Sequence, residues 1–199
     1  MAEYFPYGET EIAHLKKRDK KLGAAIDAVG PIRREVTPDL FQALIFSIAG
    51  QQISNKAART IRARLGERFE LTPAGLAMAP VEDIRQCGMS LRKAGYIKGI
   101  AESAHCGALD LAAMVDLPDQ DFIRRLEALN GIGVWTAEML LIFCLRRPDI
   151  VSWGDLAIRR GMMRLYNLSS LSREQFELRR KRYAPFGSVA SLYLWALAA

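Results

Sequence analysis

The sequence predicts an all-α protein. Apolar residues recur at the three- and four-residue spacing of an amphipathic helix along nearly the whole chain, and no stretch alternates with period two. Proline, glycine and small polar residues interrupt this pattern at short intervals. Half of the 199 residues are hydrophobic and a quarter are charged, a composition typical of soluble globular proteins. We therefore expect about ten or eleven helices joined by short loops.

The first predicted helices follow from their apolar faces and end signals. One face of the first helix carries Ile12, Leu15, Leu22, Ile26 and Val29. This helix ends at Gly30-Pro31, because glycine and proline stop a helix. Pro38-Asp39 opens a second helix, and a third begins near Ile53. Thr72-Pro73 and Ala79-Pro80 mark the starts of two short helices.

The second half of the chain continues in the same way. Ser90 and Asp119 are each followed by a helical apolar pattern, so we expect both side chains to cap helices. The remaining helices are expected at about 133–146, 155–167, 172–182 and 186–198.

Charge and cysteine content narrow the function classes. The formal net charge is +6 and the isoelectric point is about 9.4, which suits a polyanionic partner such as nucleic acid. The three cysteines, Cys87, Cys106 and Cys144, lack metal-site spacing and are expected to be buried thiols. The N-terminus has no signal-peptide apolar core, and no apolar run reaches the ~18 residues that span a bilayer. We expect a cytoplasmic protein without a membrane partner.

The most informative stretch is Leu129–Ala137, which contains Gly131-Ile132-Gly133 between two helical patterns. Two glycines around one apolar residue allow a tight turn in which Ile132 enters the core and the amides point outward. Such amides, with the N-terminus of the next helix, bind phosphate without reading sequence. A tight helix–helix turn without a ligand is the alternative for this motif alone.

The hairpin motif has a wider context. The run LNGIGVWTAEMLLIF and the downstream VSWGDLAIRRG together resemble the helix-hairpin-helix DNA glycosylases, especially the bacterial 3-methyladenine DNA glycosylase II family and its yeast counterparts. PDLFQALIFSIAGQQISNKAARTIRARL is similar to the helix pair that carries the family's DNA wedge. CGMSLRKAGYIKGIAESA is similar to the family's next helix, and YAPFGSVASLYLWAL to its closing helix.

This resemblance implies a two-lobed helical glycosylase fold with a central cleft. Residues 36–153 would form one lobe with the hairpin, and residues 1–35 plus 154–199 the other. Asp155 would open onto the cleft near the hairpin. The chain resembles compact members that lack an N-terminal β-rich domain. The pocket groups of that domain would be absent here or replaced by Tyr4, Phe5 or Tyr7, and Trp153 stands where a smaller residue is expected.

The resemblance implies that Asp155 is the catalytic carboxylate. Breaking a glycosidic bond builds positive charge on the sugar, which a fixed carboxylate stabilises, and the same group can orient the attacking water. An aspartate at this place is also a favoured helix N-cap, and both roles are compatible.

Two absences bear on the reaction. Superfamily members that also cut DNA carry a lysine two positions after the second hairpin glycine, where this chain has Trp135. We therefore expect hydrolysis to an abasic site without lyase activity. Members with an iron–sulfur cluster have four closely spaced C-terminal cysteines, and no cysteine follows Cys144, so no cluster or other cofactor is expected.

Other site residues are also implied by the resemblance. Trp135, Trp195 and Met139 would line the base pocket, where aromatic faces favour cationic alkylated bases. Core packing is the alternative for all three residues. Gln51 or Gln52 would fill the gap left by the flipped nucleotide, and two exposed glutamines are the alternative.

Phosphate contacts are expected at several places. The candidates are Gly131, Gly133, Thr136, Arg92-Lys93 and Arg159-Arg160. Thr136 is alternatively a helix cap, and a solvated face is the alternative for the charged groups. The carbonyls of Glu127, Leu129 and Gly131 would hold a Na⁺ or K⁺ ion when DNA is bound.

The resemblance implies a monomeric enzyme that flips alkylated bases such as 3-methyladenine out of double-stranded DNA and excises them. The alternatives are a glycosylase for other damaged bases, a non-catalytic helix-hairpin-helix module that binds DNA, and an all-α protein without a nucleic-acid role.

Overall fold

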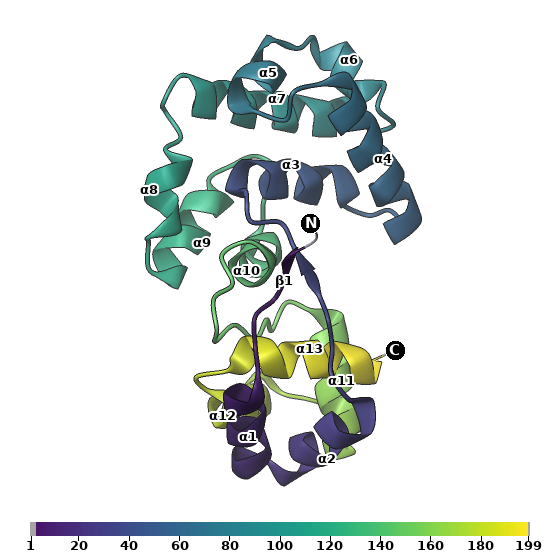
Figure 1. Cartoon of the computed structure of the whole chain (residues 1–199), viewed down its shortest axis with the longest axis vertical. Helices are drawn as coiled ribbons and strands as arrows, with labels where there is room; N and C mark the ends of the chain where they lie inside the picture. The colour runs from purple at the N-terminus through teal and green to yellow at the C-terminus, as the bar shows by residue number, and fades with distance from the viewer. Residues whose placement is uncertain (1–2, 199) are drawn as a thin grey trace. The chain divides into compact units, whose positions relative to one another are not determined.

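A computed structural model describes residues 3–198, and in this part of the chain thirteen helices account for nearly all regular structure (Figure 1). The predicted all-α class is therefore confirmed. The chain forms two compact units. We call Met1–Val36 with Leu141–Ala199 the N/C unit, and Thr37–Leu140 the middle unit.

The middle unit is built from consecutive helices. These are α3 (Leu40–Gly50), α4 (Asn55–Arg68), α5 (Pro73–Met78), α6 (Val81–Arg85), α7 (Leu91–His105), α8 (Leu111–Val115), α9 (Asp119–Glu127) and most of α10 (Val134–Phe143). Helix α7 packs against α3, α5 and α6. The fully buried side chains include Leu44, Ile45, Ile48, Leu65 and Phe122.

The N/C unit joins the two ends of the chain. It contains β1 (Glu3–Tyr4), α1 (Glu9–Arg18), α2 (Lys20–Val29), β2 (Glu35–Val36), α11 (Leu156–Tyr166), α12 (Arg173–Tyr183) and α13 (Gly187–Ala198). Helix α11 crosses α13 so closely that a Cβ at Gly161 would overlap the carbonyl of Leu194. Glycine is therefore required at this crossing.

Local end signals explain most helix boundaries. Asp39, Ser54, Thr72, Ser90 and Ser172 each accept a hydrogen bond from a backbone amide in the first turn of the following helix. The third helix begins at Asn55 rather than near Ile53, because Ser54 is its cap. The expected cap at Asp119 is wrong: Asp119 is the first residue of α9, and Pro118 precedes it.

The first predicted helix is two helices. Asp19 has extended backbone between α1 and α2, and its carboxylate accepts a hydrogen bond from Leu22 N at 3.0 Å. The apolar spacing continues across this break, so periodicity alone predicts one helix. The five-residue α8 was not predicted either.

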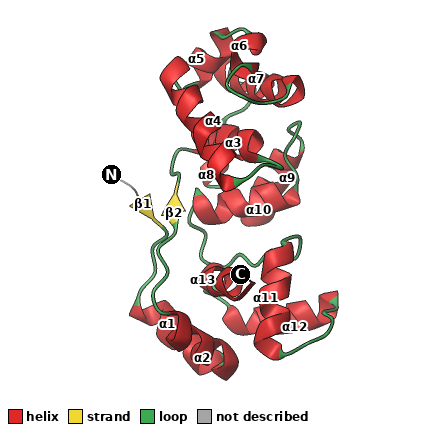
Figure 2. Ribbon diagram, turned by 90° about the vertical axis from the view of Figure 1, so that its right-hand side faces the viewer, coloured by secondary structure: helices red, strands yellow, loops and turns green. Residues whose placement is uncertain are grey.

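A short antiparallel sheet is also present. Glu3 pairs with Val36 and Tyr4 with Glu35, as Figure 2 shows for the two strands. With two residues in each strand, no alternation is visible in the sequence.

The chain returns to the N/C unit at Leu141, earlier than the predicted boundary at residue 153. The reason is that the loop after α10 is bonded to the start of α13. Gly187 N donates to Asp149 at 3.0 Å, and Ser191 Oγ donates to the carbonyl of Ile150 at 2.9 Å. None of the helices in residues 3–198 combines the length and apolar character of a membrane span.

Candidate functional site

The hairpin between α9 and α10 has the predicted geometry. Gly131 has φ +86°, and a Cβ there would lie 2.9 Å from Cε2 of Tyr96 and closer still to Cδ2. Ile132 is buried, as expected for the residue that anchors the turn. Gly133 is exposed, and a methyl group there would meet no atom of residues 3–198 within 4 Å. The two glycines therefore differ: the fold requires the first and leaves the second open.

The turn between α3 and α4 is bonded to the hairpin. Gln51 Nε2 donates to the carbonyl of Gly131 at 2.7 Å. Lys93 Nζ donates to the carbonyls of Ala49 and Gln51 at 3.2 and 2.6 Å. Burial, and then the neighbouring charge of Arg92, lower the pKa of Lys93. Gln51 and Lys93 therefore hold the turn in place.

These hydrogen bonds distinguish the two members of each candidate pair, Gln51 from Gln52 and Arg92 from Lys93. Gln52 is exposed with φ +57°, so of the two glutamines it is the one presented outward. Arg92 is exposed, whereas the ammonium of Lys93 is used within the fold. The two members of each pair could not be distinguished from the sequence, because the hydrogen bonds that distinguish them join residues 42 to 80 positions apart.

The prediction that Thr136 caps the helix is wrong. Thr136 lies in the first turn of α10, whose preceding residue is Gly133, and only 7% of it is exposed. The Gly133 carbonyl accepts from Ala137 N at 3.0 Å, which begins the helix. A direct phosphate bond from this hydroxyl is disfavoured by its burial.

The expected ion-binding carbonyls are partly engaged. The Leu129 carbonyl accepts from Ile132 N at 3.2 Å, and the Gly131 carbonyl accepts from Gln51. A carbonyl oxygen has two lone pairs, so these bonds leave room for a further ligand. The monovalent-cation site stays a prediction.

Two of the pocket candidates share one face of α10. Trp135 is 47% exposed in the first turn, and Met139 is half-buried one turn later. The exposure of a tryptophan this large is not explained by core packing.

Asp155 is held rigidly at the start of α11. It is 7% exposed, and its Oδ1 accepts from Ile158 N at 2.9 Å. The preceding residues Val151 and Ser152 are buried, so the chain on both sides of the carboxylate is anchored. The N-cap role is therefore observed, and it fixes the direction of a buried negative charge.

Trp195 belongs to an aromatic group that the sequence did not reveal. Its ring lies 5.5 Å from that of Phe143 with a 33° angle between the planes. The guanidinium of Arg34 lies 5.6 Å from the Phe143 ring centre. Aromatic faces and a cation thus already meet here, which is the interaction expected for a cationic base.

The other aromatic candidates serve the fold. Tyr7 hydroxyl donates to the Ile32 carbonyl at 2.8 Å and accepts from Ile32 N at 2.7 Å. Phe5 is buried, and Tyr4 lies under the guanidinium of Arg33. All three N-terminal aromatic residues therefore make contacts within the fold.

Trp153 also packs within the N/C unit. Its ring meets Phe176 edge-on at 5.1 Å, and the guanidiniums of Arg159 and Arg173 lie 4.9 and 5.3 Å from its centre. The guanidinium of Arg159 therefore stacks on Trp153, whereas Arg160 is exposed and is the better placed of the two for a phosphate contact.

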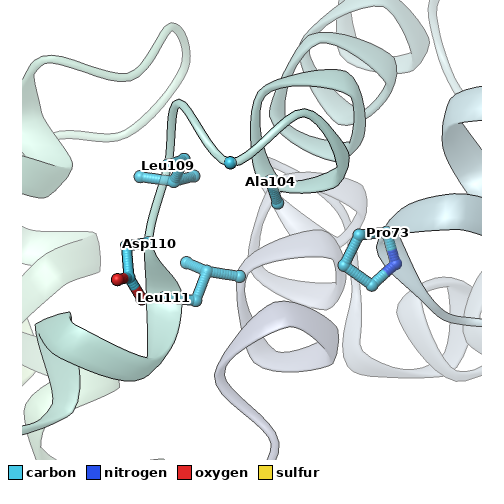
Figure 3. A pocket seen from close by; sticks show the side chains of 6 residues that line it. Pro73, Ala104, Leu109, Asp110 and Leu111 are labelled. Carbon is cyan, nitrogen blue, oxygen red and sulfur yellow. The ribbon is translucent and has the colours of Figure 1, made fainter.

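Two recesses lie in the middle unit. One of about 250 Å³ is shown in Figure 3 and is lined by Pro73, Ala104, Gly107, Leu109, Asp110 and Leu111. Asp110 caps α8, and its Oδ1 accepts a hydrogen bond from Ala113 N at 2.9 Å. The other, about 380 Å³, is lined by Ser54, Lys56, Ala57, Thr60, Ile61, Arg64 and Gly88. Of its two cations, Lys56 is exposed and is a phosphate-contact candidate missed in the sequence, whereas Arg64 donates to the carbonyl of Cys87.

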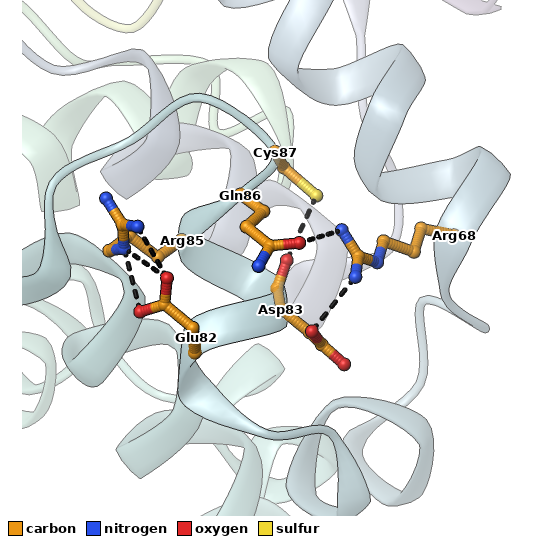
Figure 4. Close-up of polar contacts among 6 residues, drawn as sticks. All are labelled: Arg68, Glu82, Asp83, Arg85, Gln86 and Cys87. Carbon is orange, nitrogen blue, oxygen red and sulfur yellow. Dashed lines mark hydrogen bonds and ion pairs between the residues drawn. The ribbon is translucent and has the colours of Figure 1, made fainter.

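The cysteine expectation is correct for Cys87 and Cys144, which are buried, and wrong for the exposed Cys106. Cys87 lies in the polar cluster of Figure 4, where Arg68 pairs with Asp83 and Arg85 with Glu82. Burial raises the pKa of the Cys87 thiol, which keeps it protonated. Within residues 3–198, no group of three histidine, cysteine or acidic side chains is placed to hold a metal.

A glycine hairpin anchored by a buried isoleucine and exposed at its second glycine, an outward glutamine in the turn bonded to it and a buried helix-capping aspartate define the class of helix-hairpin-helix DNA-repair proteins. The chain belongs to this family: the model described as "HhH-GPD superfamily base excision DNA repair protein" matches residues 45–185.

Individual relatives agree with this assignment. The chain is 33% identical over 194 residues to DNA-3-methyladenine glycosylase 1 of Schizosaccharomyces pombe, covering 94% of this chain and 85% of that protein. A DNA-3-methyladenine glycosidase structure from Bacillus halodurans superposes with a TM-score of 0.84 at 34% identity, covering 99% of this chain and 93% of that one. The structure of the S. pombe 3-methyladenine DNA glycosylase in complex with abasic DNA superposes with a TM-score of 0.81 at 32% identity, covering 94% of this chain and 95% of that one.

Proposed function

We propose that this protein is a monofunctional DNA glycosylase that flips alkylated bases such as 3-methyladenine out of double-stranded DNA and excises them by hydrolysis. The observation that carries the proposal is the buried carboxylate of Asp155, fixed by its bond to Ile158 N. The names of the relatives, 3-methyladenine glycosylases from a yeast and a bacterium, support the substrate class.

The steps follow from the groups described above. The hairpin amides at Gly133 and the start of α10 bind backbone phosphates. Gln52 fills the space left when the damaged nucleotide leaves the stack. Trp195, which lies against Phe143 in the N/C unit, supplies an aromatic face to the flipped base, and Trp135 is the exposed aromatic candidate of the middle unit. Asp155 stabilises the positive charge that develops on the sugar and orients the attacking water, and the base departs with its bonding electrons.

No general acid is needed for a cationic base, because a base that is already positive becomes neutral on leaving. This fits a site whose proposed catalytic group is a single carboxylate. We further propose that the protein acts as a monomer, without an iron–sulfur cluster, in the cytoplasm or on the nucleoid.

The direct test is chromatography of bases released from methylated DNA. Release of alkylpurines by the wild-type protein supports the proposal. Tight binding to the damaged duplex without any release would identify a damage-binding protein instead.

Base excision is expected to proceed without strand cleavage. Trp135 occupies the position of the lysine that forms a Schiff base in lyases, and an indole cannot act as an amine nucleophile. Borohydride added during turnover should therefore trap no covalent enzyme–DNA adduct. A substantial adduct would show that another lysine attacks the sugar.

Gln52→Gly should slow excision from duplex DNA while leaving the fold intact. Glycine adopts the φ of +57° observed at Gln52 without strain, so only the side chain is lost. Because unstacking a base costs a few kcal/mol, loss of the filling group should slow single-turnover excision by roughly tenfold.

Gln51→Ala is the matched control. It removes the bond to the Gly131 carbonyl and should lower the free energy of unfolding by about 1 kcal/mol. Its effect on excision should be the smaller of the two. A larger excision defect in Gln51→Ala than in Gln52→Gly would reverse the assignment.

A further inference from the structure

A cluster of cations lies on the N/C unit around Tyr166. Lys21 Nζ and the Arg179 guanidinium lie 5.8 and 4.8 Å from the centre of the Tyr166 ring. Arg182 lies 3.4 Å from Asp19, whose other contacts include the Tyr166 hydroxyl at 2.5 Å. Arg18 and Lys20 flank Asp19 and are exposed. We call Arg18, Lys20, Lys21, Arg179 and Arg182 the Tyr166 basic patch.

The patch is assembled from segments far apart in the sequence. The end of α1 and the start of α2 lie at the patch, where α1 packs against α12 and α2 packs against α11, all within the N/C unit (Figure 1). The carboxylate within the patch is that of Asp19, which is 4% exposed and bonded to Leu22 N and Tyr166. The nearby Asp27 and Glu177 are themselves paired with Lys16 and Arg173. The positive charge of the patch is therefore largely uncompensated.

Stability explains this clustering only in part, because Lys21 and Arg179 share the Tyr166 ring and Arg182 pairs with Asp19. Lys21 and Arg179 both lie close to the Tyr166 ring, so the two positive charges are within about one Debye length of each other. At this separation they repel each other. Lys20 and Lys21 occupy the first turn of α2, which contains no acidic residue, although the helix dipole disfavours cations there. Arg182 lies in the last turn of α12, where a cation is favoured, and so it has a structural reason. On α2, Lys21 gains a cation–π contact with Tyr166 that offsets this cost, whereas Lys20 has no ring contact within residues 3–198.

The patch is separate from the proposed catalytic group. Asp155 caps the N-terminus of α11, and Tyr166 is the last residue of that eleven-residue helix. At 1.5 Å per residue, the helix places the two about 16 Å apart.

The composition of the patch favours a polyanion over a folded protein partner. Protein–protein interfaces are enriched in aromatic residues and arginine but depleted in lysine, so the exposed Lys20 and Lys21 are the residues that favour a polyanion. Here the outward groups are lysines and arginines, and the aromatic ring lies beneath them. Flexible cations without a rigid apolar centre suit a DNA backbone, whose charges are closely spaced.

We propose that the Tyr166 basic patch is a second DNA-backbone-binding surface, distinct from the excision site. It raises the affinity for undamaged DNA without reading sequence. This inference rests on the proposed function in taking DNA as the polyanion.

The test compares salt titrations of a long undamaged duplex for wild type and Lys20→Gln/Lys21→Gln. Each lost phosphate contact reduces the slope of log affinity against log salt by about 0.9, so the double variant should lose about 2 from the slope. The matched control is Arg68→Gln/Arg85→Gln, which removes two cations whose carboxylate partners appear in Figure 4. The control should keep the wild-type slope.

Four further results decide the proposal. Single-turnover excision at saturating enzyme should be unchanged in Lys20→Gln/Lys21→Gln, because Asp155 is untouched. An unchanged slope in this variant, or an equal loss in the control, overturns the patch. Weakened binding to polyglutamate with unchanged DNA binding would also overturn it and identify an acidic protein as the partner. If the wild-type protein released no base, yet the slope of log affinity against log salt fell in Lys20→Gln/Lys21→Gln as expected, the proposed function would be wrong and the patch would stand.

Discussion

Asp155→Asn should fold, bind DNA that contains an abasic analogue, and lose base excision by about 10²–10³-fold. Asparagine has nearly the same shape and is as good a helix N-cap, so the bond from Ile158 N is retained. What is lost is the negative charge that opposes the developing sugar cation. The measurement is single-turnover base release from DNA with one defined lesion, beside thermal melts of both proteins.

The chain offers a matched control for this substitution. Asp39 caps α3 through a bond from Gln42 N at 2.7 Å, and it is exposed. Asp39→Asn makes the same chemical change at a helix cap and should leave excision at the wild-type rate. Equal rates for wild type and a well-folded Asp155→Asn would leave Asp155 as a cap alone.

The substrate should change the size of the effect. A neutral damaged base is a poor leaving group, so its transition state relies most on the carboxylate. A cationic alkylated base leaves more readily and should retain more activity in Asp155→Asn. The ratio of the two defects therefore reports how far the enzyme depends on Asp155 for each class of base.

The helices were predictable because their signals are local. Ser90, Asp155 and Ser172 each bond to an amide three residues ahead, and such pairs are visible in a short window of sequence. The break at Asp19 was missed although its cap bond from Leu22 N is equally local, because the apolar spacing continues across it. Its carboxylate is also bonded to Tyr166, which lies 147 residues away.

The candidate site shows the same division. The hairpin glycines and Asp155 stand out in the sequence, since each belongs to a short motif. The roles of Gln51, Lys93 and Phe143 do not, because each depends on a contact with a distant segment. Sequence reasoning thus identifies which short segments carry chemistry, and folding decides which neighbouring side chain faces outward.

Gly131 and Gly133 should respond differently to the same substitution. Gly131→Ala forces a Cβ onto the Tyr96 ring at a φ of +86°, so it should lower the free energy of unfolding by about 2–4 kcal/mol. DNA affinity should fall with it, because the turn that aims the amides is displaced. Urea unfolding and duplex titrations measure the two effects.

Gly133→Ala isolates the contact with DNA. Residues 3–198 place no atom within 4 Å of the added methyl group, so the free energy of unfolding should stay near the wild-type value. The methyl group stands where a phosphate would approach the amides, and losing one charge-assisted hydrogen bond of about 1.5–3 kcal/mol should weaken DNA binding at least tenfold. Wild-type affinity in Gly133→Ala would exclude the hairpin from backbone binding. Wild-type stability in Gly131→Ala would mean that Tyr96 does not hold the turn, and that the two glycines are equivalent.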